Sequence, residues 1–372
     1  MTTTDRTNSS GSTGPAGAPE HTLDRPEQTA SARVAAIVAG RRARHRRHAS
    51  ATIVLGILVF ALFAVALMVG NTFYTPDEVI RVILGETVPG ASFTVGDLRL
   101  PRAVLAILTG FGFGIARVSF QTLLRNPLAS PDIIGISAGA GAAAVFGIIV
   151  LSLNGPVVSV FALAGAVLTA LVIYLLSIKG GFAGTRLILI GIGVAAMLQS
   201  LISYMLSRAA NWDIQTAMQW LTGSLNNASW ERVLPMAIAA AVIVPLMLSQ
   251  GRALGALQLG DDSASGLGIR VNVTRLLFIL GAVTLLAFAT AATGPIAFVA
   301  FMAGPIAARI TGPGANLLLP SAFVGAVLVL GSDLIAQFLL GTRYPVGVVT
   351  GVLGAPYLIY LLIRTNRSGG SL

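Results

Sequence analysis

The chain has 372 residues, of which 55% are hydrophobic and only 10% charged, and its mean hydropathy is +0.84. A soluble domain carries about 25% charged residues, so these proportions exclude an ordinary soluble protein and indicate that lipid is part of the solvent. Much of the net charge of +10 lies in a basic run at residues 41–48, directly before an apolar segment. Such a run is typical of a membrane-orientation signal beside anionic lipid, so we expect no nucleic-acid partner.

The apolar part of the chain contains neither cysteine nor histidine. The sequence has no cysteine at all, and its three histidines, His21, His45 and His48, precede the first apolar run. These facts exclude disulfides, thiolate metal sites and cysteine nucleophiles, and they remove the commonest metal ligand and proton shuttle. We therefore predict no metal site, no cofactor and no catalytic residues.

The apolar runs divide the chain into three parts. Residues 1–50 are predicted to be a disordered cytoplasmic tail that is rich in Ser, Thr, Gly and Pro over its first 30 residues and ends in the basic run. The Ala-rich stretch at 30–40 is compatible with a short helix leading into that run. Residues 51–364 form the membrane domain, and residues 365–372 form a second short cytoplasmic tail.

Ten apolar stretches in the membrane domain are candidates for spanning helices, which need about 20 mostly apolar residues. They are residues 51–70, 101–121, 133–153, 156–178, 186–206, 233–250, 275–293, 296–310, 317–340 and 345–363. The predicted fold is an all-α integral membrane protein, a bundle of about ten transmembrane helices. With the N-terminus inside, fourteen Lys and Arg residues fall in inner segments and six in outer ones, which the positive-inside rule favours. Both termini of this multi-pass protein are then cytoplasmic.

Five groups of segments in the membrane domain follow one another in a specific order. They are LRLPR at 98–102 with RNPLA at 125–129 and PDIIG at 131–135; WLTGSL at 220–225; LGDD at 259–262; GPIAF at 294–298; and YPVGVVT at 344–350 with GAP at 354–356. In order and spacing they resemble the FecCD family, the permease subunits of ABC importers for iron-siderophores and cobalamin. The resemblance covers residues 51–364 and implies a helix bundle like that of the cobalamin permease.

The resemblance implies a transport subunit that moves a ferric siderophore into the cytoplasm while a separate subunit hydrolyses ATP. It implies three partners: a cytoplasmic ABC ATPase dimer, an extracytoplasmic siderophore-binding protein, and a second permease subunit that is either another copy or a related chain. The sequence agrees, because Lys179, its only lysine, lacks the glycine spacing of a phosphate-binding loop. The nearest alternative is the same machinery carrying cobalamin or haem.

Two alternatives come from other classes of protein. Ion-coupled carriers usually keep ionisable residues inside the membrane, and Asp333 is the one acidic residue inside a predicted span. A proton relay through this carboxylate would make the chain a secondary carrier, but the sequence offers no second acid or base to complete such a relay. A membrane enzyme would need a nucleophile, a base and an orienting group together, and no such set is evident.

Three arginines lie at the outer mouth in the predicted topology, namely Arg99, Arg102 and Arg343. Fixed cations there can pair with carboxylates on an arriving soluble protein, and the resemblance implies that this protein is the siderophore-binding protein. The alternative is that these arginines anchor the helix ends at lipid headgroups.

The longest inner loop between spans, residues 250–274, resembles the loop through which the family couples to its ATPase. The residues that carry this resemblance are Leu259, Gly260, Asp261, Asp262, Ala264, Leu267 and Gly268. We expect this polar, Gly-punctuated stretch to form short helices at the cytoplasmic face, although a plain connecting loop is the alternative. For the translocation path, the resemblance indicates Gln121, Asn126, Pro127, Ser137 and Gly139.

The sequence departs from the family pattern in three places: at Arg117, at Ser265 in the coupling loop, and at residues 304–309. Position 117, four residues before Gln121, is usually small in the family and is Arg117 here. We expect its long stem to lie on apolar neighbours while the guanidinium snorkels toward the inner membrane surface. The alternative is a charge held deeper in the bundle, which would cost about 2.5–3.5 kcal/mol on an insertion scale.

Overall fold

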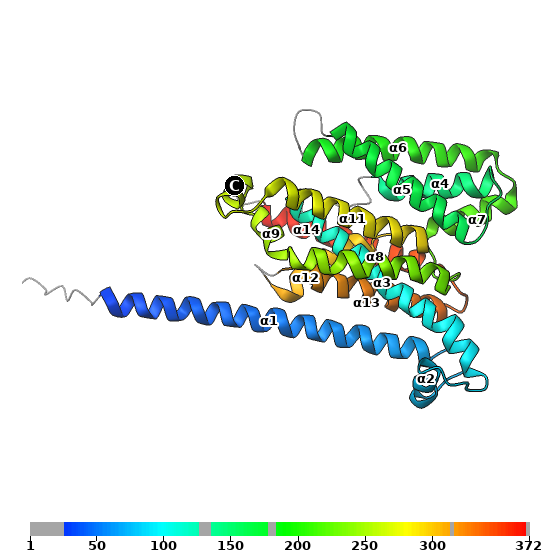
Figure 1. Cartoon of the computed structure of the whole chain (residues 1–372), viewed down its shortest axis with the longest axis horizontal. Coiled ribbons are helices and arrows are strands. Elements are labelled where there is room, and N and C mark those ends of the chain that lie inside the picture. Colours follow the sequence, from blue (N-terminus) through cyan, green and yellow to red (C-terminus); the bar gives the residue numbers. More distant parts are fainter. Residues whose placement is uncertain (1–25, 126–134, 178–183, 313–315, 370–372) are drawn as a thin grey trace, which may run out of the picture. The chain divides into compact units, whose positions relative to one another are not determined.

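The computed structural model describes residues 26–125, 135–177, 184–312 and 316–369. Every regular element in these ranges is a helix (Figure 1). The elements are α1 Pro26–Met68, α2 Pro76–Ile83, the π-helical segment η1 Ser92–Arg99, α3 Leu100–Leu123, α4 Ile136–Ile149, α5 Pro156–Ser177, α6 Gly184–Arg208, α7 Asn211–Thr222, α8 Trp230–Ser249, α9 Gly251–Leu257, α10 Asp261–Gly266, α11 Val271–Thr293, α12 Val299–Thr311, α13 Leu318–Phe338 and α14 Val346–Gly369.

Ten helical segments in the described ranges are apolar enough to lie in a membrane. Seven are also long enough to cross it: α1, η1 with α3, α5, α6, α8, α11 and α13. The other three are α4, α12 and the Val346–Leu361 part of α14. Each predicted span overlaps one of these segments, so the prediction of an all-α bundle with about ten membrane helices is confirmed. With 14 and 13 residues, α4 and α12 are only about 20 Å long, so they do not cross the hydrocarbon layer as helices alone.

Helix α1 is longer than the sequence predicted. It runs over 43 residues from Pro26 to Met68, so the prediction of a disordered tail across 1–50 is wrong for residues 26–50, while residues 1–25 lie outside the described ranges. The basic run contains mostly arginine, a good helix former, and no proline follows Pro26 before Pro76. Since adding a residue to an existing helix is far easier than starting one, the first membrane helix extends through the basic run.

Helix α3 lies in the middle of the bundle, in contact with α8, α11, α12 and α13 (Figure 1). Most of its residues are buried. It approaches α13 closely because glycines meet there: a Cβ on Gly114 would overlap the Ser321 backbone, and a Cβ on Gly325 would overlap that of Gly110. Lipid gives no hydrophobic drive for helix association, so close packing at small residues takes that role.

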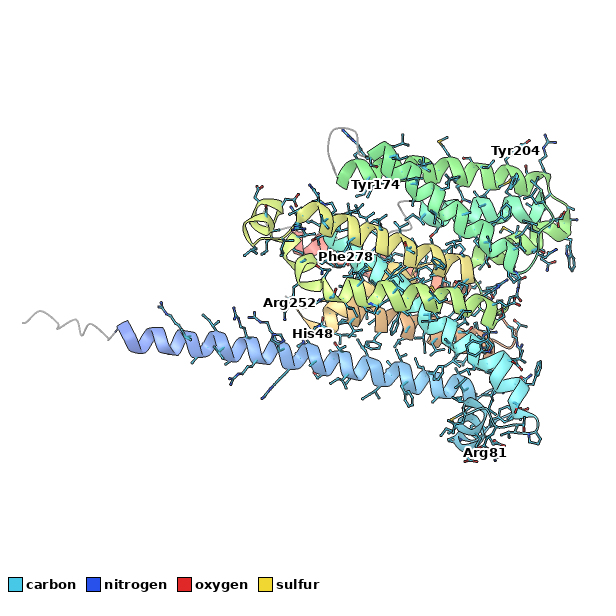
Figure 2. All side chains as sticks on the ribbon, in the orientation of Figure 1. His48, Arg81, Tyr174, Tyr204, Arg252 and Phe278 are labelled. Atoms are coloured by element: carbon cyan, nitrogen blue, oxygen red, sulfur yellow. The ribbon has the colours of Figure 1, made fainter. Side chains whose placement is uncertain are left out.

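The two ends of α3 define two ends of the bundle. With 24 residues, α3 is about 36 Å long, and Arg102 lies near its start. Arg81 of α2 is found at this end and Arg252 of α9 at the opposite one (Figure 2). Helix α10, which begins with Asp261, packs on α9. We therefore call the two ends the Arg102 end and the Asp261 end.

Candidate functional site

A cavity of about 350 Å³ lies at the Arg102 end of the bundle. The residues that line it include all three arginines predicted to dock a soluble protein, Arg99, Arg102 and Arg343, together with Asp333 and Gln337. They come from η1, α3, α13 and the connection between α13 and α14. The structure therefore brings the three predicted arginines together, but the contacts that each one makes differ.

Arg102 forms a bidentate ion pair with Asp333. Its Nε donates to Oδ2 at 2.9 Å and its Nη2 to Oδ1 at 2.8 Å, and the two side chains are only 15% and 3% exposed. Gln337 also donates to Asp333 at 2.7 Å, and Asn226 accepts from Arg102 at 3.0 Å. Asp333 is thus not an isolated acid: its charge is balanced by Arg102, and the pair joins α3 to α13.

Arg99 is engaged with the end of α1. Its Nη1 donates to the carbonyl oxygens of Leu67 and Met68 at 2.9 and 3.0 Å, and its Nη2 donates to that of Thr72 at 2.7 Å. The guanidinium carbon lies 5.0 Å from the ring centre of Tyr74. A helix leaves its last carbonyls without partners within the helix, and Arg99 supplies donors for them.

Arg343 is exposed in the turn between α13 and α14. Within the described part of the chain, no carboxylate, carbonyl or aromatic ring pairs with its guanidinium. Of the three predicted docking residues, it is the one whose charge is available to a partner without breaking a contact inside this protein.

At the Asp261 end, the predicted coupling stretch contains the expected short helix, α10, with α9 before it. Gly260 and Gly268 flank α10 with φ of 110° and 81°, a region that glycine adopts without strain. Ala264 is buried, whereas Leu259 and Leu267 are 66% and 65% exposed. Both leucine side chains are therefore available to contact another protein.

Asp261 pairs with two cations. Its Oδ1 accepts from Nη2 of Arg125 at 2.7 Å, and its Oδ2 accepts from Nη2 of Arg275 at 2.8 Å. The hydrogen bond from Arg275, with the charges of both arginines, lowers the pKa of Asp261 below its ordinary value, so the carboxylate is ionised at neutral pH. The neighbouring Asp262 is exposed.

The described residues among those predicted for the translocation path lie on two helices, α3 and α4. Gln121 lies on α3 beside Gly304 of α12, whereas Gly139 of α4 packs against Thr169 of α5. Ser137 also lies on α4. Asn126 and Pro127 are outside the described residues. Gly139 therefore has a helix-packing role, and assignment of these residues to a path stays a prediction.

The expectation that Arg117 snorkels to the membrane surface is wrong. Its side chain is fully buried, and its guanidinium carbon lies 4.6 Å from the ring centre of Phe301 on α12. A cation over an aromatic face in a dry site gains roughly 2 kcal/mol. The alternative of a deeper charge describes this residue, because α3 is surrounded by other helices along its length.

Sequence reasoning did not identify Asn226, Gln337 or Arg275 as parts of a site. A signal was available for the Arg102–Asp333 pair, because Asp333 is the only acid in a predicted span and lies in its outer half, at the predicted end of Arg102. No comparable signal marks Asn226 and Gln337, since polar residues at helix ends are common.

We predict that Arg102 and Asp333 depend on each other for stability. Arg102→Met leaves a buried carboxylate without its cation, and Asp333→Leu leaves the arginine without its anion, so each should lower the free energy of unfolding by about 3–5 kcal/mol. The double substitution removes both charges and should cost much less than the sum. Unfolding of the purified protein in detergent gives these values.

Arg81→Met, in an exposed pair with Glu86, is the control and should change stability by less than about 1 kcal/mol. Strictly additive losses would contradict the coupling.

The sequence matches the FecCD transport family over residues 57–364. The chain is 37% identical over 320 residues to the iron(3+)-hydroxamate import system permease protein FhuG of Bacillus subtilis (strain 168), covering 83% of this chain and 95% of that protein. It is 38% identical over 299 residues to the ferric enterobactin transport system permease protein FepG of Escherichia coli (strain K12), covering 78% and 88%. It is 34% identical over 279 residues to the vitamin B12 import system permease protein BtuC of Vibrio cholerae serotype O1, covering 74% and 84%.

The fold is also found among solved structures. An inward-facing conformation of a metal-chelate type ABC transporter superposes with a TM-score of 0.75 at 24% identity, covering 84% of this chain and 98% of that one. At this identity the likeness establishes the fold alone. The family match includes both the helix that begins at the Arg102 end and the loop at the Asp261 end, and this multi-pass membrane protein belongs to the FecCD transport family.

Proposed function

We propose that this chain is the membrane-spanning permease subunit of a binding-protein-dependent ABC importer, and that it moves a ferric siderophore into the cytoplasm. ATP is hydrolysed by a separate subunit. The observation that carries the proposal is the family match over residues 57–364, which takes in nearly the whole membrane domain. The ferric substrate is supported by identities of 37% and 38% to two permeases named for iron chelates. The permease named for vitamin B12, at 34% identity, makes cobalamin the competing substrate.

The ATPase is proposed to bind at the Asp261 end, where Leu259 and Leu267 expose apolar surface.

A second permease subunit is proposed to cover α6, because this membrane helix exposes Gln199, Ser200 and Ser203. Polar side chains that face lipid are unfavourable. This face is therefore suited to contact with another subunit, or to lining a water-filled path between the two subunits. The mass of the purified complex distinguishes two copies of this chain from one copy with a related chain.

The Arg102 end is proposed to face outward, with both termini in the cytoplasm, as the arginine distribution favours. Because the chain has no cysteine, single cysteines report sidedness without background. Arg343→Cys should react with a membrane-impermeant maleimide in intact cells, and Ser265→Cys, in the exposed part of α10, should react only after lysis. The reverse pattern would show that the orientation is inverted.

ATP dependence separates the importer from the ion-coupled carrier. In proteoliposomes that contain the permease, its ATPase and its binding protein, ferric siderophore uptake should require ATP. The chain alone should show no uptake under a proton or sodium gradient, since Asp333 is held by Arg102 and no second intramembrane acid or base is present in the described helices. Gradient-driven uptake by the chain alone would establish the secondary carrier instead.

The binding protein is proposed to dock over the cavity at the Arg102 end. Arg343 is the main contact in this proposal, because Arg99 and Arg102 already have partners in the chain. These two arginines would shape the cavity and add to its positive field. Lipid-headgroup anchoring is the competing role for all three residues.

Arg343→Glu should weaken binding of the loaded binding protein without preventing membrane insertion or ATPase binding. One exposed ion pair is worth about 0.2–1 kcal/mol and reversal adds repulsion, so we expect a roughly three- to tenfold loss of affinity at low salt, with a smaller loss at high salt. Arg81→Glu makes the same charge change on α2, outside the cavity, and is the control. Reversing the matching carboxylate on the binding protein should restore part of the affinity. Unchanged affinity at low salt would assign Arg343 to headgroup anchoring.

A further inference from the structure

The residue that follows the last turn of α3 has an unusual backbone. Arg125 comes directly after the C-cap residue Leu124 and has a φ of 48°. This left-handed region is adopted at helix ends mainly by glycine and sometimes by asparagine, because other side chains are strained there. A residue that keeps an unfavourable backbone at such a position points to a role for its side chain.

The side chain of Arg125 reaches the segment formed by α9 and α10. Its Nε donates to the carbonyl oxygen of Leu257, the last residue of α9, at 3.2 Å, and its Nη2 donates to Asp261, the first residue of α10, at 2.7 Å. More than 130 residues separate Arg125 from these partners, as the intervals of 132 and 136 show. Arg125 therefore connects α3 to a segment that the chain itself joins only to α8 and α11.

Asp261 also connects the segment to α11. Arg275, in the second turn of α11, donates to the carboxylate oxygen that Arg125 does not use, and its side chain is only 13% exposed. Charge-assisted hydrogen bonds of this length are among the stronger ones in proteins, but Arg125 and Asp261 are each 48% exposed, so water weakens their pair. One carboxylate thus lies between cations from α11 and from the residue just past α3, at the start of α10, whose C-cap residue is the exposed Leu267.

A cavity of about 830 Å³ lies beside the segment. It is lined by Leu254 and Leu259 of the segment, by Thr122 of α3 and by Ala308 of α12. Gln258, another lining residue, donates to the hydroxyl oxygen of Thr122 at 3.5 Å. The segment is therefore packed against the bundle over only part of its surface, and its polar contacts to α3 and α11 help to hold its position.

We propose that Asp261 is a positioning residue which ties the α9–α10 segment to α3 and α11, so that displacement of this segment by the ATPase moves both helices together. The inference rests on the proposed function and deepens it. Helix α11 is already joined to the segment by the chain, whereas α3 meets it only through non-covalent contacts. The Arg125–Asp261 pair, at 2.7 Å, is shorter than the Gln258–Thr122 hydrogen bond, at 3.5 Å. Loss of the carboxylate should consequently weaken the link between α3 and the segment while the ATPase still binds through the exposed leucines.

The test uses the complete reconstituted importer and measures substrate imported per ATP hydrolysed, alongside co-purification of the ATPase. Asp261→Asn keeps the shape of the side chain and removes its charge. Arg125→Gly removes the cation but gives the left-handed position the residue that it favours, so thermal stability should be equal or higher. Both variants should import less substrate per ATP by about two- to thirtyfold, the range over which single contacts alter coupling between sites. Asp261→Glu should recover part of the loss.

The control is Glu86→Gln, which neutralises the carboxylate of another exposed Arg pair at the far end of the bundle, and it should leave import per ATP unchanged. If the wild-type complex imports with ATP and both Asp261→Asn and Arg125→Gly keep its import per ATP, the positioning role is wrong while the proposed function stands. If either variant loses the ATPase during purification, Asp261 is a binding contact and the inference is again wrong. Failure of the wild-type complex to import would instead remove the proposed function itself.

Discussion

A charge inside a lipid-embedded bundle needs a counter-ion or hydrogen-bonding groups within the protein, and α3 is the helix on which this constraint acts most strongly. Arg102 near its start pairs with Asp333 on α13. Arg117 in its interior lies against an aromatic ring of α12. Arg125, just past its end, pairs with Asp261 on α10. Each cation therefore ties α3 to a different element, in addition to the glycine contacts that bring α3 and α13 together.

The helices could be predicted from the sequence because each one is a local property. An apolar window of about 20 residues defines a span, and the ordered motifs define the family. Pairing is different, since Arg102 and Asp333 are 231 positions apart, and which side chains meet depends on how each helix is rotated and which helix lies beside it. The hydropathy pattern gives neither the rotation of a helix nor the identity of its neighbour. As the only acid inside a predicted span, Asp333 suggested an unusual role, but the sequence did not identify its partner.

The predictions for individual arginines show the same limit in physical terms. Position at a helix end indicated that Arg99 points outward, yet the carbonyls at the end of α1 need donors and lie within its reach. Depth along α3 indicated that Arg117 could reach the surface, yet helices on every side bury it. In both cases the position of the charged group depends on which hydrogen-bond acceptors and helices lie beside it, and this is a property of the tertiary structure. Arg343 lies in an exposed turn, and none of the described residues pairs with its guanidinium.

Two helices connect the ends of the bundle where partners are proposed to act. Besides α3, helix α8 runs from Trp230, whose indole donates to the Gly96 carbonyl of η1 at 3.3 Å, to the start of α9. Close-packed interiors transmit strain, so on the proposed function a shift of the α9–α10 segment should reach the Arg102 end along both helices. Coupling of binding free energies is reciprocal. On the proposed function, a nucleotide state of the ATPase that alters the cavity at the Arg102 end must change the affinity for the binding protein. By the same coupling, the docked binding protein must change the nucleotide affinity of the ATPase. The Arg125–Asp261 contact brings α3 into this coupling, together with the Gln258–Thr122 hydrogen bond, because no stretch of chain joins α3 directly to the segment.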